Sequence, residues 1–438
     1  DPRDLHSFPT RRSSDLADLT NLTELRIGWF GPTNLNDPLH GDLWWAANRA
    51  VDEANADLPI SNFKFQISNP SLLPFRLIPR WSVDPWGTGI SQLTRMVYDE
   101  EPLAVLGSVD SASTHLAEQI VAKANLPLVS PIATDPSVTL AGVPWMFACA
   151  PSDAAVARVL VDAILQCALS IRADGSGIKG PPPRLVLLAA TDHESRMTSR
   201  EVLRELSRRQ RPPDFRLELS TRAGALDHLL ATLAEIEPQV MLIVSGADDA
   251  ARLVRALHAN TGSPGNPLSA AAIFGSQAMG CTRFLELAGD AAEGVRFPLL
   301  AMSAPDDADA IGFIEAFTAA RGHAPDYATI LTYDATRLLL AAIRKAGPNR
   351  DRVRSALIGL SPWPGMGGTI RFDGTGQNTR TRLALATIRR GCLEWTTIHP
   401  DSRTASPSSD ERRESALEKG MKHRPPVNSP LQQAHSVR

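Results

Sequence analysis

The chain has 438 residues, of which 43% are hydrophobic and 21% are charged, and its formal net charge is −3. This is the composition of a globular protein with room for two or three lobes, each with a core of its own. The near-neutral charge gives no electrostatic reason to expect nucleic acid or an anionic membrane as a partner. Since no run of 18 apolar residues is present, the sequence predicts no membrane-spanning helix.

The two ends of the chain lack the apolar periodicity of folded segments. Residues 1–23 contain the stretch "LHSFPTRRSSDL", which has charges and serines but no apolar core. We therefore expect a disordered or artefactual leader there rather than a signal peptide. Residues 399–438 are polar and rich in proline, which predicts a disordered tail.

Between these ends, short apolar runs alternate with amphipathic stretches at helical spacing, such as "GDLWWAANRAVDEANA" and "STHLAEQIVAKAN". The runs that we interpret as buried strands are residues 25–30, 63–68, 103–107 and 126–130 in a first series, and residues 184–190, 215–220, 239–246 and 271–275 in a second. Continuous apolar strands separated by helices predict an α/β fold with parallel sheets covered on both faces. Because the series occurs twice, we expect two similar lobes.

Two further stretches complete the pattern. Residues 69–89 are rich in aromatic side chains and are expected to form a long insertion, in which Trp81 and Trp86 either line a cleft or pack against the lobe. More helices are expected after residue 300, and residues 367–391 are typical of a β-hairpin.

Small hydroxyl residues follow two neighbouring predicted strands. Ser111 comes shortly after "LAVLG", and Thr134 comes shortly after "LPLVS". In open parallel sheets, ligands bind outside the carboxyl ends of the strands, and free N–H groups at a helix start favour an anion. Helix capping by serine or threonine would explain either group of hydroxyl residues taken alone. The helix after the first group is expected to begin near His115. The pair favours a binding cleft for a small polar ligand.

No motif in the sequence points to catalysis. Nucleophile-elbow, zinc-protease and phosphate-loop motifs are absent. The four cysteines have no C-x-x-C spacing and the histidines have no metal-ligand spacing, while disulfides among the cysteines are neither asserted nor excluded. We therefore expect a protein that is not an enzyme and that needs no cofactor and no metal.

The hydroxyl-rich stretch resembles the periplasmic binding proteins of the branched-chain amino-acid transport type. Members carry a strand, a glycine, a serine-rich turn, a helix, a second strand and then S-P-x-A-T-(N/D)-P, which is "SPIATDP" at residues 130–136. The segment "LAGDAAEGV" at residues 287–295 and the opening "IGWFGPTNLNDPLHG" are similar to two further family segments. The resemblance covers residues 24–395.

The resemblance implies a type I periplasmic binding protein, in which two doubly wound parallel-sheet lobes close on a ligand and are joined by three crossover segments. The crossovers are expected near residues 150–153, 298–303 and 365–368. The expected organisation is residues 24–150 plus 301–364 for lobe 1, and residues 151–300 plus 365–398 for lobe 2. Three connecting segments permit a hinge while keeping the lobes in register.

The resemblance also implies the ligand contacts of the first lobe. Ser111 matches a serine that bonds the ligand carboxylate through its side chain and backbone, and Thr134 matches a threonine that bonds the same group. Ile132 matches a position whose backbone carbonyl accepts from the ligand ammonium, and Ala133 lies between the two in the same motif. His40 stands where the family has an aromatic residue.

The second lobe departs from the family pattern. Gln277 stands where the family has an acidic residue that pairs with the ligand ammonium, and an amide cannot neutralise that charge. One aromatic position of the family falls near Ala247 or Asp248, and another falls near Ser195. We therefore expect Asp110, Asp192 or Asp248 to supply the missing negative charge.

These features together predict a solute-binding subunit of an ABC-type importer that captures an amino acid, an amide or a small carboxylate by hinge closure. Its partners would be the ligand and membrane permease subunits, and the protein would be a monomer in the periplasm or on a lipid anchor outside the cytoplasm. The alternative is a ligand-sensing regulatory protein of the same fold that is not coupled to transport.

Overall fold

The computed structural model describes residues 22–58, 72–173, 182–222, 224–261, 267–303, 307–380 and 383–397. All of them belong to one compact unit, Asp1–Ile398. The predicted leader up to residue 21, the predicted strand at residues 63–68 and the predicted tail lie outside the described residues.

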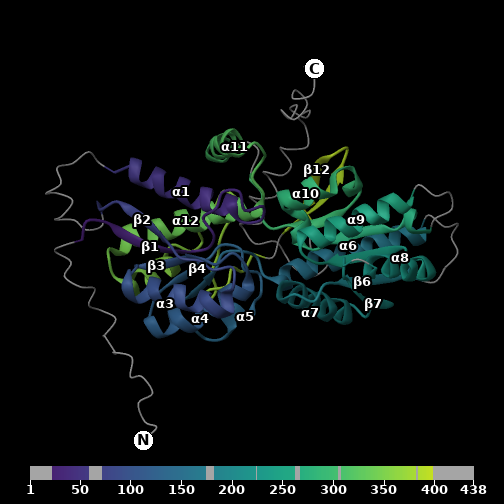
Figure 1. The fold of residues 1–438 in the computed structure, drawn as a ribbon, viewed down its shortest axis with the longest axis horizontal. Coiled ribbons are helices and arrows are strands. Elements are labelled where there is room, and N and C mark those ends of the chain that lie inside the picture. Colours follow the sequence, from purple (N-terminus) through teal and green to yellow (C-terminus); the bar gives the residue numbers. More distant parts are fainter. Residues whose placement is uncertain are drawn as a thin grey trace, which may run out of the picture. The chain divides into compact units, whose positions relative to one another are not determined.

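The first sheet contains the strands of the first predicted series and is parallel throughout. Within the described ranges its order is β2-β1-β3-β4-β5, with β1 Leu25–Phe30, β2 Phe75–Pro79, β3 Ala104–Gly107, β4 Leu128–Ser130 and β5 Met146–Ala148. Helices α1 (Gly41–Ala56) and α12 (Tyr327–Ala346) pack together over one face, and α3 (Ile90–Asp99) and α4 (Ser111–Ala124) cover the other (Figure 1).

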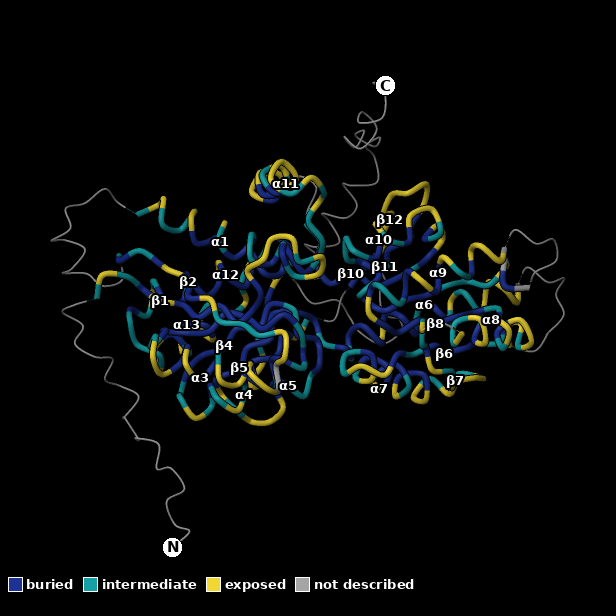
Figure 2. Tube along the Cα trace, in the orientation of Figure 1, coloured by how far each residue is buried: buried dark blue, intermediate teal, exposed yellow. Residues whose placement is uncertain are grey.

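Alternation along the strands divides the apolar side chains of this sheet between two cores. Trp29 and Leu106 belong to the cluster on the side of α1 and α12, whereas Phe30 and Val105 belong to the cluster on the side of α3 and α4. Successive side chains of a strand point to opposite faces, so a sheet covered on both faces needs continuous apolar runs. The buried strands appear dark blue in Figure 2.

The second sheet has the order β12-β11-β10-β9-β8-β6-β7 within the described ranges. The parallel strands are β6 Leu185–Ala189, β7 Phe215–Glu218, β8 Val240–Val244, β9 Ala272–Gly275 and β10 Arg296–Leu299, and the antiparallel pair is β11 Ala384–Arg389 and β12 Cys392–Thr397. Helices α6 (Asp153–Ala173) and α7 (His193–Arg208) pack together on this sheet, and α9 (Ala247–Thr261) contributes to a separate core.

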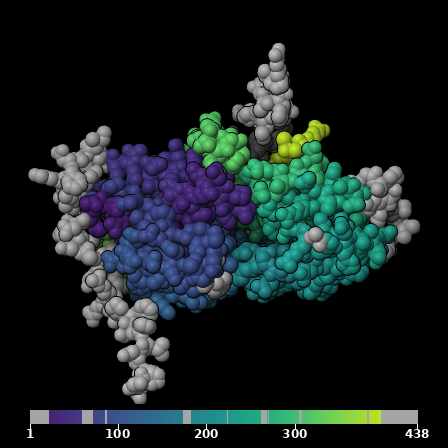
Figure 3. Space-filling model, in the orientation of Figure 1, coloured from purple at the N-terminus to yellow at the C-terminus, as the bar shows by residue number. Residues whose placement is uncertain are grey.

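The remaining helices are short or lie at the edges of the two sheets. They are α5 Ser137–Leu140, α8 Ala225–Ile236, α10 Thr282–Ala288, α11 Ala308–Arg321 and α13 Arg350–Gly359, with single turns η3 Pro85–Gly89, η4 Pro267–Ala270, η5 Gln277–Gly280 and η6 Gly289–Ala292. In Figure 3 the bright green atoms of α11 lie against the purple atoms of the α1 region, where Arg321 forms an ion pair with Asp42.

The chain passes between the two sheets three times, after β5, after β10 and before β11. At the first passage, the backbone N–H of Asp153 donates to the carbonyl of Thr134 at 2.7 Å. The third passage does not lie near residues 365–368 as predicted, because the N–H of Asn378 still donates to the carbonyl of Ala148 in β5 at 3.1 Å. The boundaries of the two lobes stay a prediction.

The C-terminal hairpin also lies further along the chain than predicted. Strands β11 and β12 are joined by a turn at Arg390 and Gly391, whose φ angles are 53° and 69°. Two central residues with positive φ are typical of a two-residue hairpin turn. The segment "DGTG" within the predicted hairpin does form a turn, but the carbonyl of Gly376 accepts there from the N–H of Ala148 at 2.9 Å, so that segment lies beside the first sheet.

The stretch predicted as an insertion contains an edge strand. Strand β2 pairs in parallel with β1, and its residues Phe75 and Leu77 are buried. Trp81 packs against Phe30 with the ring centroids 5.2 Å apart, so it packs against the lobe rather than lining a cleft. The side chain of Trp86 lies outside the described residues.

Strand β7 was predicted as a buried strand, and this prediction is wrong. Phe215 is 41% exposed, and the strand appears largely yellow and teal in Figure 2. Its place at the end of the sheet explains the exposure, because an edge strand is covered less completely than a central one. Apolar content alone did not distinguish the two positions.

Helix α6 is long and apolar enough to cross a membrane by length and composition, the one such helix in the part of the chain that the structure describes. Val156 and Leu160 in its first half are fully buried, and the helix packs against α7 and the second sheet. These contacts identify it as a core helix of the fold.

Candidate functional site

The first turn of α4 follows directly from the end of β3. The helix begins at Ser111 rather than near His115, and its cap is Asp110, whose Oδ1 accepts from the N–H of Ser113 at 2.6 Å. The expectation that a serine or threonine caps this end of α4 is therefore wrong. The buried hydroxyl of Ser111 instead accepts from the N–H groups of Thr134 and Asp135, both at 3.3 Å, which ties together the turns after β3 and β4.

The first turn of α7, after β6, repeats the same capping pattern. Asp192 caps the helix, and its carboxylate accepts from the N–H of Ser195 at 2.9 Å and from the hydroxyl of Ser195 at 2.6 Å. The two residues between cap and serine are His193 and Glu194. Both have long side chains, and both reach residues of the first sheet's turns.

Glu194 binds the start of α4. Its Oε1 accepts from the backbone N–H of Ser111 at 2.9 Å and from that of Ala112 at 3.1 Å. Burial, with the nearby charge of Asp110, raises the pKa of Glu194. A helix N-terminus is a favourable position for an anion, because its first N–H groups are unpaired within the helix. The carboxylate of Glu194 thus occupies the anion position that the start of α4 offers.

Gln277 meets Thr134 from the second sheet. Its Nε2 donates to Oγ1 of Thr134 at 3.5 Å, and its side chain is buried. Within the described part of the chain, Oε1 of Gln277 has no hydrogen-bond partner. An unpaired buried acceptor costs about 1–3 kcal/mol, so this oxygen is ready to accept a hydrogen bond from a donor in the cleft.

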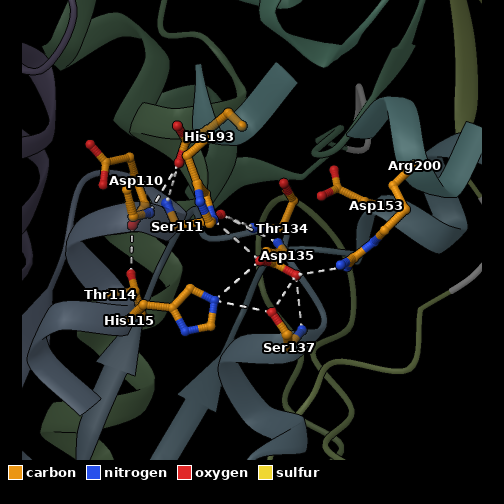
Figure 4. A network of polar contacts seen from close by, with 12 residues as sticks. Asp110, Ser111, Thr114, His115, Thr134, Asp135, Ser137, Asp153, His193 and Arg200 are labelled. Carbon is orange, nitrogen blue, oxygen red and sulfur yellow. Dashed lines mark hydrogen bonds and ion pairs between the residues drawn. The ribbon is translucent and has the colours of Figure 1, made fainter. Parts of the chain in front are cut away.

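Asp135, beside Thr134, is the centre of a network of polar contacts that Figure 4 shows. Its Oδ2 lies 3.1 Å from Nε2 of His115 and 3.3 Å from Nε2 of His193, and its Oδ1 accepts from the N–H of Ser137 at 2.9 Å. Although burial opposes the charge, the hydrogen bonds from His115 and Ser137 hold the pKa of Asp135 well below its usual range. The carboxylate joins α4, the turn after β4 and α7.

Asp153 is a second buried carboxyl near this network. Its Oδ1 accepts from the hydroxyl of Thr198 in α7 at 2.8 Å, and only 1% of the residue is exposed. Burial raises the pKa of Asp153 to about 7, against the hydrogen bonds from Thr198 and Thr134. The residue therefore changes charge near neutral pH, at the point where the chain passes from one sheet to the other.

The remaining predicted ligand contacts have neighbours of their own. His40 precedes α1 and has its Nδ1 3.6 Å from Asp37, and burial lowers its pKa. Asp248 forms an ion pair with Arg283 at 2.8 Å. Ile132 is half-buried against the first core, and Ala133 is buried, with its N–H donating to the hydroxyl of Ser130 at 3.3 Å.

The three carboxylates that we expected to supply a negative charge to the cleft all have partners within the protein. Asp110 and Asp192 accept hydrogen bonds as helix caps, and Asp248 forms an ion pair with Arg283. Each carboxylate keeps lone pairs beyond these bonds, so its role toward a ligand stays a prediction. Glu194 is a further acidic side chain near the cleft, since it reaches the turn of Ser111.

A polar cavity of about 290 Å³ lies between the loop before α1 and the start of α10. Its lining includes Leu35, Asp42, Arg283, Arg321 and Asp326. Ser111, Thr134 and Gln277 do not line this cavity, because they are buried in contact with one another and with Glu194.

Sequence reasoning missed Glu194, His193, His115 and Asp135. The two histidines are far apart in the chain and come from different sheets, so their spacing gave no metal-ligand signal. A usable signal was the repeated pattern of aspartate followed three residues later by serine, in "DSAS" and "DHES". This pattern predicts two similar helix starts. The two residues between the aspartate and the serine indicate which helix start has side chains long enough to contact another element.

Comparison with known proteins gives the same fold. The family model for periplasmic binding proteins matches residues 82–392. The branched-chain amino-acid transporter substrate-binding protein LivJ of Streptococcus pneumoniae, solved with isoleucine, is 18% identical, with a TM-score of 0.71 over 86% of this chain and 100% of its own. The leucine-binding protein LivK of Thermotoga maritima is 18% identical, with a TM-score of 0.67 over 86% of this chain and 99% of its own.

A solute-binding protein of an ABC transporter from R. palustris, solved with benzoate, has a TM-score of 0.67 at 15% identity, over 86% of this chain and 98% of its own. No curated protein sequence matches the chain. The family match covers most of the described residues, and the two sheets with their three connections agree with it. The chain therefore belongs to the periplasmic binding protein family.

Proposed function

We propose that the protein is the solute-binding subunit of an ABC-type importer, which captures a small polar ligand between its two lobes by hinge closure. The observation that carries this proposal is a pair of contacts between strand ends of the two sheets, from Glu194 to Ser111 and from Gln277 to Thr134. Ligands of open α/β sheets bind at such strand ends, and two facing sets are suited to closing over a small molecule.

The ligand that fits these contacts is a small molecule with N–H donors, such as an amine or an amide. Oε1 of Gln277 offers an acceptor without a partner among the described residues, and Glu194 adds a negative charge close by. A ligand carboxylate would compete with Glu194 for the N–H groups of Ser111 and Ala112, and two carboxylates in a closed cleft repel. Among the predicted ligand classes, this favours an amide over a small carboxylate.

The partners and location follow from the same proposal. A soluble binding subunit docks on membrane permease subunits, and we expect it outside the cytoplasm, either free in the periplasm or on a lipid anchor. We also expect a monomer, which size-exclusion chromatography with light scattering would establish.

The proposal is tested by a thermal-shift screen with matched pairs of acids and their amides, such as leucine with leucinamide and isovaleric acid with isovaleramide. We expect the amide of a pair to raise the melting temperature more than its acid, since a bound ligand stabilises the folded state. Glu194→Gln should reverse the preference, because it removes the competing charge. Glu237→Gln, at the exposed end of α8, is the control and should leave it unchanged.

Stronger stabilisation by the acids in the parent protein, unchanged in Glu194→Gln, would reject the ligand class but keep the binding function. If no member of the panel and no wider set of small polar solutes bound, the binding function itself would be wrong.

A further inference from the structure

Three metal-binding side chains converge from three separate elements of the fold. His115 lies in the first turns of α4, Asp135 in the turn after β4, and His193 at the first position of α7. Oδ2 of Asp135 lies 3.1 Å from Nε2 of His115 and 3.3 Å from Nε2 of His193, and the three ligand atoms all lie within 4.8 Å of one another. Figure 4 shows both imidazole rings directed at this carboxylate.

Two of the three spacings between these atoms match those of ligands around one metal ion. Zinc binds histidine nitrogen and carboxylate oxygen at about 2.0–2.2 Å in tetrahedral geometry, which places neighbouring ligand atoms about 3.4 Å apart. The two distances from Asp135 fall close to this value. The carboxylate is also held in place, because its other oxygen accepts from the N–H of Ser137 at 2.9 Å and lies 3.6 Å from Arg200.

The surroundings of His115 favour a metal at its Nε2. Its other ring nitrogen, Nδ1, lies 3.4 Å from Oε2 of Glu118, which orients the ring. Histidines that bind metals commonly donate the N–H of the second nitrogen to a carboxylate in this way. A metal ion between Nε2 and Asp135 would take the place of the proton that otherwise forms their hydrogen bond.

We propose that His115, Asp135 and His193 bind one divalent transition-metal ion, with zinc as the probe of choice. Two imidazole nitrogens and one carboxylate oxygen suit zinc and its neighbours in the first transition series. The side chains of His115 and His193 are 23% and 29% exposed, so an ion can enter from solvent. The hydroxyl of Ser137, 3.1 Å from Nε2 of His115, or a water molecule completes the coordination.

Such an ion would link the two sheets. His115 and Asp135 belong to the turns and helices of the first sheet, whereas His193 starts a helix that packs on the second. Metal binding would therefore stabilise the arrangement in which α4 and α7 face each other, without using Gln277 or the hydroxyl of Thr134.

The test uses the full chain after removal of metals with a chelator, titrated with zinc chloride in a calorimeter. We expect one zinc ion per chain and an increase in melting temperature. His193→Ala and His115→Ala should each weaken zinc binding at least tenfold. The control is His228→Ala, which removes an exposed histidine of α8, and it should bind zinc as the parent does.

A spectroscopic measurement separates loss of the site from loss of the fold. Cobalt(II) in place of zinc should give the visible absorption of a four-coordinate ion in the parent and in His228→Ala, and lose it in His193→Ala while the far-UV circular dichroism is retained. Zinc binding that is absent from the parent, or equal in the parent and both site variants, would overturn the proposal.

Discussion

The first turns of α4 and α7 start with the same pattern, an aspartate cap followed three residues later by a serine, but the two residues in between differ. In α4 they are Ser111 and Ala112, which are small and leave the backbone N–H groups accessible to a partner. In α7 they are His193 and Glu194, whose side chains cross to the other sheet and become that partner.

This comparison shows how one local structure serves two opposite roles. The cap fixes the direction of the helix, and the first two helical positions decide whether its N-terminus receives an anion or provides one. The first-sheet half of the cleft keeps the hydroxyls and amides that the family resemblance implies. The second-sheet half departs from the pattern that the resemblance implies at Gln277, Ser195 and Asp248, and Glu194 reaches across from α7.

The largest predicted effect concerns Asp153, which connects the two halves. Burial raises its pKa to about 7 from the reference value of 3.8. Between pH 4 and pH 7, the carboxyl of Asp153 is therefore protonated in the folded state and ionised in the unfolded chain. The parent should therefore lose more stability than Asp153→Asn as pH rises from 4 to 8, because the variant lacks this one titrating group. We expect the free energy of unfolding of the parent, relative to the variant, to fall by about 4 kcal/mol over this range.

Urea unfolding of the two proteins at a series of pH values measures this difference. Asparagine keeps an oxygen that accepts from the hydroxyl of Thr198, so the variant should fold. If the free energies of unfolding of the two proteins changed with pH in parallel, the buried carboxyl of Asp153 would not titrate in this range. Its charge would then not make the stability depend on pH.

The second prediction tests whether the two serines differ as the structure indicates. Ser111→Ala removes an acceptor from two backbone N–H groups, those of Thr134 and Asp135, and should reduce the free energy of unfolding by about 2 kcal/mol. Ser195→Ala removes only a donor to Asp192, which still accepts from the backbone N–H of residue 195, and should cost less than about 1 kcal/mol.

Chemical denaturation of both variants under the same conditions gives the comparison. Equal losses would mean that the hydroxyl of Ser111 does not hold the turn after β4. That result would restore the expectation, drawn from the family resemblance, that this hydroxyl acts only on the ligand.

The sequence predicted the α/β fold and most of the strands because buried parallel strands are continuous apolar runs, as in β3 and β8. The sequence also predicted that Ser111 and Thr134 lie close together, because each follows the end of one of two neighbouring strands. The sequence misplaced the hairpin, because both "DGTG" and residues 390–391 can form a turn. Only the pairing of β11 with β12 shows which of the two turns joins the strands of the hairpin.

The part of the site that sequence reasoning could not supply is the contact between sheets. In the sequence, Glu194 looks like an ordinary surface carboxylate, and Asp135 stands out only as part of the motif at residues 130–136. Their roles depend on how α7 packs against the turns of the first sheet, and no local periodicity encodes that packing.

The smallest predicted effect concerns Gln277, which contributes a neutral amide to the second-sheet half. Gln277→Glu restores the acidic residue that the family resemblance implies, opposite the hydroxyl of Thr134. A carboxylate there should strengthen the binding of a ligand with an ammonium group about tenfold relative to its uncharged analogue, equivalent to about 1.4 kcal/mol. Gln166→Glu adds the same charge at an exposed position of α6 and should leave the ratio unchanged. Isothermal titration with leucinamide and isovaleramide measures the ratio, and an equal ratio in both variants would place the ammonium away from Gln277 and leave Glu194 as its partner.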